Sequence, residues 1–138
     1  MTLMIETQKT IAPNTTLLWD MLQTMRPAQS KTEKQFVSKY LDSVRGMKAD
    51  SYGNRYIKIG DSKIAWSCHT DTVHHAAGKQ RIVYNKNKGT IHLSQSESIA
   101  SCLGADDTGG VWLMLEMIRA KKTGLYIFHR DEEIGGLG

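Results

Sequence analysis

The chain has 138 residues, of which 40% are hydrophobic and 23% charged, as is typical of a single globular domain. Its net charge of +4 arises from 18 basic and 14 acidic residues scattered along the sequence, which argues against a nucleic-acid-binding surface. No apolar run approaches the roughly 20 residues needed to cross a bilayer, and the first ten residues lack the features of a signal peptide. We therefore expect a cytoplasmic protein without a nucleic-acid or membrane partner.

Two helices are predicted in the first third of the chain. The first covers Thr15 to Met25 and ends before Arg26-Pro27, and the second covers Ser30 to Val44 with Ser30 as its N-cap. The apolar residues at helical spacing are Leu17, Leu18, Met21 and Leu22 in the first segment and Phe36, Val37, Tyr40, Leu41 and Val44 in the second. Residues of these types at this spacing indicate a core-facing stripe.

Strands and a further helix are predicted after Val44. The strand segments are Met47 to Tyr52 and Arg55 to Ile59 (a hairpin), Lys63 to Cys68, Arg81 to Tyr84 and Thr90 to Leu93 (a second hairpin), and Leu125 to His129. A helix over Val111 to Lys122 separates the last of these from the others. Apolar strands on either side of a long helix predict an α/β architecture with parallel strand pairs.

Polar clusters follow two of the predicted strands and precede the helix between them. His69-Thr70-Asp71 comes after one strand, Asp131-Glu132-Glu133 comes after the other, and Asp106-Asp107 lies at the start of the helix. Functional residues of α/β sheets gather at the carboxyl ends of the strands. The positions of the clusters therefore predict one shared site.

Each cluster has an ordinary explanation as well as a chemical one. His69 can bind a metal while Asp71, two residues on, holds the other ring nitrogen, but a lone H-x-D is usually no metal site. At the start of the helix, Asp106 or Asp107 alone would suffice as the N-cap. Gly109 and Gly110 each lower helix stability by about 1 kcal/mol, so we expect the backbone to pass close to another group there.

Glu132 and Glu133 repel each other unless a cation or a proton separates them. A metal ion would bind one of these carboxylates and leave the other free as a base. The alternative for this cluster is a solvated acidic turn.

The three motifs H-x-D, G-A-D-D-x-x-G and D-E-E-x-G, in this order, resemble those of the dizinc exopeptidases, a superfamily that includes bacterial tripeptidases, glutamate-carboxypeptidase-like enzymes and zinc aminopeptidases. The resemblance runs from about Asp50 to Gly138 and is strongest to the tripeptidase branch. It implies that residues 1–138 are the amino-terminal portion of a single metallopeptidase catalytic domain. The implied fold is a three-layer α/β/α arrangement with a mixed, mostly parallel sheet, part of a phosphorylase/hydrolase-like fold.

The resemblance also assigns roles to individual residues. His69 would bind one Zn²⁺ ion and Glu133 a second, with Asp106 bridging the two; Co²⁺ or Mn²⁺ would suit the same ligands. Asp71 would orient the imidazole, and Glu132 would be the general base that takes a proton from the attacking water. In these enzymes the peptide bond between Asp106 and its successor is commonly cis.

The sequence departs from the family pattern at two points. Thr108 stands where tripeptidase-like members often have lysine, and a hydroxyl there can cap the helix. The family supplies each ion with a further ligand, an Asp or Glu and a His, for which this sequence has no counterpart. His74, His75 and His129 are weak substitutes, because loop and strand positions account for them.

Two interpretations follow. In the first, the chain is the amino-terminal part of a split peptidase that hydrolyses short peptides, and a second polypeptide supplies the other ligands and the strands that should pair with the edge ending at His69. In the second, it is an inactive, truncated peptidase-like binding or assembly module that covers this edge by self-association. The retention of all three motifs favours the first.

Overall fold

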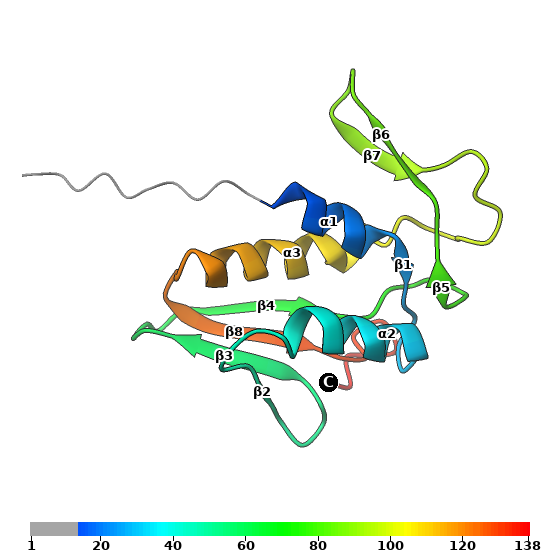
Figure 1. Cartoon of the computed structure of the whole chain (residues 1–138). Coiled ribbons are helices and arrows are strands. Elements are labelled where there is room, and N and C mark those ends of the chain that lie inside the picture. Colours follow the sequence, from blue (N-terminus) through cyan, green and yellow to red (C-terminus); the bar gives the residue numbers. More distant parts are fainter. Residues whose placement is uncertain (1–13) are drawn as a thin grey trace, which may run out of the picture.

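The computed structural model describes residues 14–138, so the expectation about a signal peptide concerns residues outside the described range. The elements are α1 (Thr15–Leu22), β1 (Thr24–Met25), α2 (Lys31–Phe36), the π-helical turn η1 (Val37–Leu41), β2 (Lys48–Ala49), β3 (Arg55–Ile59), β4 (Ala65–His69), β5 (Gly78–Lys79), β6 (Ile82–Asn85), β7 (Thr90–Leu93), α3 (Ala105–Arg119) and β8 (Gly124–His129) (Figure 1). The mixture of helices and sheets confirms the predicted α/β class.

A four-stranded sheet in the order β2-β3-β8-β4 forms the centre of the molecule. β2, β3 and β8 are joined by antiparallel pairings, whereas β4 runs parallel to β8 with Ala65 beside Leu125 and His69 beside His129. The sheet is therefore mixed, as predicted. The prediction of a mostly parallel sheet does not hold for residues 14–138, because β3 returns to pair antiparallel with β8.

The helices cover one face of this sheet. Tyr126 and Phe128 of β8 are fully buried and belong to a core with Cys68 of β4 and Val111 and Met114 of α3. Residues alternate between the two faces of a strand, and Leu125, Ile127 and His129 on the other face are only half-buried. Within residues 14–138 the arrangement is thus a helical layer on one sheet face, and the third layer stays a prediction.

The helix boundaries differ from those that periodicity predicted. α1 ends at Leu22, not Met25, because Thr24–Met25 pair with β5 as a short strand. The predicted second helix is divided into α2 and η1 and stops at Leu41; its N-cap is confirmed, since the Ser30 side chain accepts a hydrogen bond from the Glu33 N–H. α3 spans Ala105–Arg119, but Asp106 and Asp107 have non-helical backbone angles, so the regular helix begins at Thr108, three residues before the predicted Val111.

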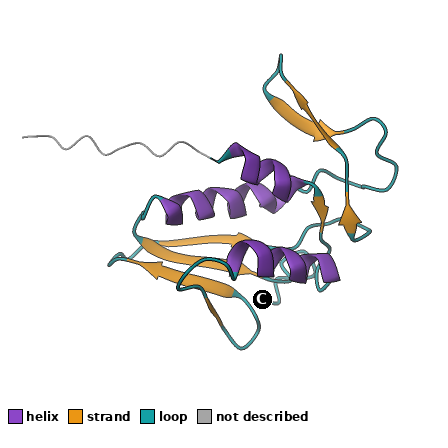
Figure 2. Cartoon of the chain, viewed as in Figure 1, coloured by secondary structure: helices purple, strands orange, loops and turns teal. Residues whose placement is uncertain are grey.

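Both predicted hairpins are present. β2 and β3 flank the Gly53-Asn54 turn, and β6 pairs with β7 from Ile82 opposite Leu93 to Asn85 opposite Thr90. Figure 2 shows the β6–β7 hairpin standing apart from the four-stranded sheet. Among residues 14–138 no helix combines the length and apolar character required to cross a membrane.

A buried carboxylate ties α2 to the ends of β4 and β8. Glu33 is fully buried and accepts two hydrogen bonds from Arg130, at 3.1 Å from Nε and 2.7 Å from Nη2. The Thr70 hydroxyl also donates to Glu33, at 2.8 Å. Since Thr70 follows β4 and Arg130 follows β8, Glu33 holds together the segments that carry the polar clusters.

We expect Glu33→Ala to lower the free energy of unfolding by about 3–5 kcal/mol, because it removes one partner of a buried ion pair and leaves Arg130 without its carboxylate. Urea titration of the 138-residue chain measures this. The control is Lys39→Ala, which breaks the exposed pair with Asp20 and should cost about 1 kcal/mol or less. Equal losses in the two variants would contradict the role given to Glu33.

Candidate metal centre

The parallel pairing of β4 with β8 brings two of the polar clusters together. His69 is the last residue of β4 and lies beside His129, the last residue of β8. The chain continues into Thr70-Asp71 on one side and into Asp131-Glu132-Glu133 on the other. α3, which packs on β4, brings Asp106 to the same edge from the third cluster.

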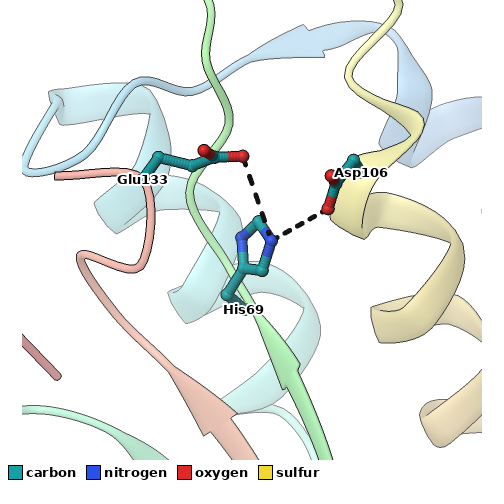
Figure 3. Close-up of side chains that lie close together, drawn as sticks. All are labelled: His69, Asp106 and Glu133. Atoms are coloured by element: carbon teal, nitrogen blue, oxygen red, sulfur yellow. Dashed lines mark hydrogen bonds and ion pairs between the residues drawn. The ribbon is translucent and has the colours of Figure 1, made fainter. Parts of the chain in front are cut away.

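His69, Asp106 and Glu133 converge at this edge (Figure 3). One potential ligand atom from each of the three side chains lies within 4.8 Å of the other two. His69 Nε2 is 3.0 Å from Asp106 Oδ1 and 4.0 Å from Glu133 Oε1. The structure thus places together the three residues predicted as metal ligands.

Asp71 holds the histidine and the acidic turn at the same time. His69 Nδ1 lies 2.8 Å from the main-chain carbonyl oxygen of Asp71 and 3.6 Å from its carboxylate. The fully buried carboxylate accepts hydrogen bonds from the N–H groups of Glu132 at 3.1 Å and Glu133 at 2.9 Å. The imidazole is therefore oriented mainly by the carbonyl of Asp71, while the carboxylate fixes the turn that presents the two glutamates.

Glu132 lies at the exposed side of the group. Its Oε2 is 3.7 Å from His69 Nε2, and 53% of its side chain is exposed, against 19% for Glu133. Both glutamates therefore face the same histidine, which the alternation of an extended strand would not allow; the turn after β8, with φ of +57° at Asp131, redirects them. Glu132 is therefore the more accessible of the two glutamates.

The two aspartates at the start of α3 have different functions. Asp107 caps the helix, since its Oδ1 accepts from the Gly110 N–H at 2.9 Å, and its Oδ2 accepts from the His69 N–H at 3.3 Å. Asp106 projects outward with 85% of its side chain exposed. The peptide bond between them is cis, as the resemblance predicted.

Only one of the two glycines in this turn meets a close neighbour. A Cβ at Gly110 would lie 2.1 Å from Asp107 Oδ1, whereas one at Gly109 would meet nothing within 4 Å. The expected close approach is therefore confirmed for Gly110, where the neighbour is the capping carboxylate. At Gly109, which is half-buried, the expectation is not met among the described residues.

The charges at the site are unbalanced in favour of the acids. Burial by itself lowers the pKa of the His69 imidazole, but the interactions with Asp71 and Asp106 outweigh it and raise that pKa to about 9. Burial also raises the pKa of the Glu133 carboxyl, which the charge on His69 counteracts only in part. At neutral pH His69 is therefore protonated, and its positive charge is stabilised by the surrounding carboxylates.

The other candidate histidines lie elsewhere in the fold. His74 is buried, with Nδ1 2.6 Å from the Thr72 hydroxyl and Nε2 2.9 Å from Gln80 Oε1, so both ring nitrogens have partners. His75 is exposed on the following loop, and His129 is half-buried within β8. The group around His69 contains none of them.

Sequence reasoning missed Arg26 and misjudged Thr108. Arg26, which the pattern showed only as the end of a helix, is fully buried behind the site and donates to Thr108 at 2.7 Å. The Thr108 hydroxyl donates in turn to the carbonyl of Gly104, so it does not cap the helix as expected. A charged residue directly before a proline was the available signal, but nothing local indicates its distant partners.

Comparison with known proteins yields a likeness in fold. No protein-family model and no curated protein matches the chain. Among solved structures, the chain is similar to the aminoacylhistidine dipeptidase from Vibrio alginolyticus, with a TM-score of 0.61 over 97% of this chain at 16% sequence identity. The chain spans 31% of the length of that protein. At this identity the likeness shows the fold alone: the chain folds like part of that dipeptidase.

Proposed function

We propose that this chain carries part of the active centre of a metal-dependent peptidase that acts on short peptides. One observation carries the proposal, namely the convergence of His69, Asp106 and Glu133 within 4.8 Å at the ends of β4 and β8. The likeness in fold to part of an aminoacylhistidine dipeptidase supports a short peptide as the substrate.

The donor set fits a zinc ion. One imidazole nitrogen and two carboxylate oxygens are ligands that catalytic zinc accepts, and three protein ligands are its usual number. Cobalt or manganese ions also accept this donor set. The resemblance assigns His69 and Glu133 to different ions bridged by Asp106, but all three side chains lie close enough together to hold one ion. A second ion shared through Asp106 would then require ligands from outside residues 14–138.

Glu132 would be the general base. When bound, zinc supplies Lewis acidity towards the scissile carbonyl and the attacking water. The Glu132 carboxylate takes a proton from that water as its oxygen bonds to the carbonyl carbon, and it returns the proton to the amine nitrogen as the C–N bond breaks. Asp71 contributes by keeping His69 and the Glu132-Glu133 turn in place.

We propose further that a second polypeptide completes the centre, and three features support this. The donors suffice for one ion, while the resemblance implies two. β4 is an edge strand within residues 14–138, with Ala65 and Ser67 exposed. The sheet face of Leu125 and Ile127 is only half-covered. A strand added parallel to β4 would bring its own carboxyl end to His69.

Glu132→Gln should lower turnover of a short peptide by about 10²–10⁴-fold while the metal content is unchanged, because an amide cannot accept the proton. Peptide hydrolysis and metal analysis of the complete enzyme measure the two effects. Asp61→Asn, which removes an equal charge from a fully exposed turn, is the control. Loss of metal together with undiminished turnover per bound ion would contradict the role of Glu132.

Metal binding should release about one proton per ion at pH 7, because His69 with its pKa of about 9 is protonated there and must lose this proton to bind. The affinity should therefore rise with pH until the pH passes that pKa. Calorimetric titration with Zn²⁺ in two buffers of different ionisation enthalpy measures the release. Equal observed enthalpies in the two buffers would mean that no proton is released, and this would contradict binding by a protonated His69.

Ser67→Pro should prevent assembly with the second polypeptide and leave the chain folded. The Thr70 N–H donates to the carbonyl of His129, and the Leu125 N–H donates to the carbonyl of Ile64. Because the N–H groups of a strand point alternately to its two sides, the Ser67 N–H points away from β8, towards the open edge. Proline is tolerated at such an edge position, because its missing N–H breaks no bond to β8. Co-purification with the product of the neighbouring open reading frame, the mass of the complex and its peptidase activity are the measurements.

Ser67→Ala, which keeps the N–H, is the matched control for that experiment and should assemble like the wild type. The wild-type complex should bind two ions and turn over peptide, whereas the chain alone should bind at most one ion and turn over no peptide. A stable homo-oligomer without metal, together with no partner-dependent activity, would favour the binding-module interpretation instead.

A further inference from the structure

Arg26 is a buried side chain that lies behind the candidate site and contacts none of the predicted ligands directly. It follows β1, and none of its surface is exposed. Its Nε donates a hydrogen bond of 2.5 Å to the main-chain carbonyl of Thr70, and its Nη2 donates one of 2.7 Å to the Thr108 hydroxyl. The backbone of Arg26 makes two further hydrogen bonds to Thr72. The Thr72 N–H donates to the Arg26 carbonyl at 3.0 Å, and the Arg26 N–H donates to the Thr72 hydroxyl at 3.3 Å.

The two acceptors belong to two of the three segments that present the metal donors; the third, which carries Glu133, is not bonded to Arg26. Thr70 lies between His69 and Asp71, and Thr108 lies two residues after Asp106. These segments are 38 positions apart in the chain, between residues 70 and 108, and Arg26 is separated from them by 44 and 82 positions. One guanidinium group thus joins the loop after β4 to the first turn of α3.

The surroundings of Arg26 keep its side chain fixed and charged. The guanidinium carbon lies 3.8 Å from the centre of the Phe36 ring, and Nη1 has no hydrogen-bond partner in the described structure. Burial lowers the pKa of Arg26 to about 10, and the negative charges of Glu33 and Asp71 oppose that decrease. The group is therefore a cation at neutral pH, packed against an aromatic ring.

The two hydrogen bonds require a planar fork. Arginine presents donors in several fixed directions, whereas lysine offers one nitrogen at the end of a flexible chain. A lysine at position 26 would therefore satisfy Thr70 or Thr108 but not both. Groups that lie behind the ligands and orient them commonly change metal affinity by about 10–100-fold when they are removed.

We propose that Arg26 is a positioning residue whose guanidinium fork fixes His69 relative to Asp106 by holding the Thr70 carbonyl and the Thr108 hydroxyl. The consequence for metal binding rests on the proposed function, whereas the coupling of the two loops does not. The test therefore needs one readout with metal and one without it.

Three variants of the 138-residue chain separate the contributions: Arg26→Met removes the fork, Arg26→Lys keeps the charge, and Thr108→Val removes one acceptor. The readouts are Co²⁺ affinity from visible absorbance and amide hydrogen exchange in residues 69–72 and 104–109, compared with the β6–β7 hairpin. Ile57→Ala, a core truncation in β3, controls for a general loss of stability.

We expect Arg26→Met to weaken Co²⁺ binding at least tenfold and to increase exchange in both loops together. Arg26→Lys should restore protection in one loop only, and Thr108→Val should affect residues 104–109 alone. Ile57→Ala should leave the Co²⁺ affinity within about twofold of wild type, since it touches neither loop.

Wild-type affinity in Arg26→Lys, or an equal loss of affinity in Ile57→Ala, would overturn the proposal. If Arg26→Met does not fold, Arg26→Lys and Thr108→Val decide, and unchanged exchange in both would also overturn it. A wild-type chain and complex that bind no Co²⁺ would contradict the proposed function, while the exchange data would still decide whether Arg26 couples the loops.

Discussion

The parallel pairing of β4 with β8 is the constraint on which the candidate site depends. It sets His69 beside His129, so the segments that follow these residues turn at the same edge of the sheet. Because side chains alternate between the faces of a strand, a shift of one residue in this register would turn His69 onto the face that the helices cover. The buried carboxylate of Asp71 then joins the two segments by accepting hydrogen bonds from the N–H groups of Glu132 and Glu133.

The acids at this edge divide into those that build the site and those that remain available. Asp71 and Asp107 use their carboxylates in hydrogen bonds to backbone N–H groups, so they hold the loops. Asp106, Glu132 and Glu133 keep their carboxylates directed towards His69. Three carboxylates around one imidazole are stabilised by a positive charge, which a proton provides in part and a divalent cation would provide more fully.

The local patterns in the sequence predicted much of the fold, and the non-local pairings account for what they missed. Periodicity and turn residues located both hairpins, the strand Leu125 to His129 and the long helix that precedes this strand. They could not show that β3 would pair antiparallel with β8, nor that Thr24–Met25 would leave the first helix to pair with β5. Those outcomes depend on segments far away in the chain.

The same limit applies to the site. Its three motifs could be found because each is local and resembles a known family, and the structure brings their residues together. Arg26 and Glu33 have no such signature, since their partners lie between 37 and 97 positions away. A buried charge is visible in a sequence only when its partner is nearby, so the supports behind the ligands emerged from the structure alone.

A crystal structure of the chain grown with Zn²⁺, with anomalous scattering recorded on both sides of the zinc absorption edge, would show whether His69, Asp106 and Glu133 bind the ion together. We expect an anomalous peak at bonding distance from His69 Nε2 and from carboxylate oxygens of Asp106 and Glu133. A peak elsewhere, for example at the exposed His75, together with an empty position at His69, would contradict it.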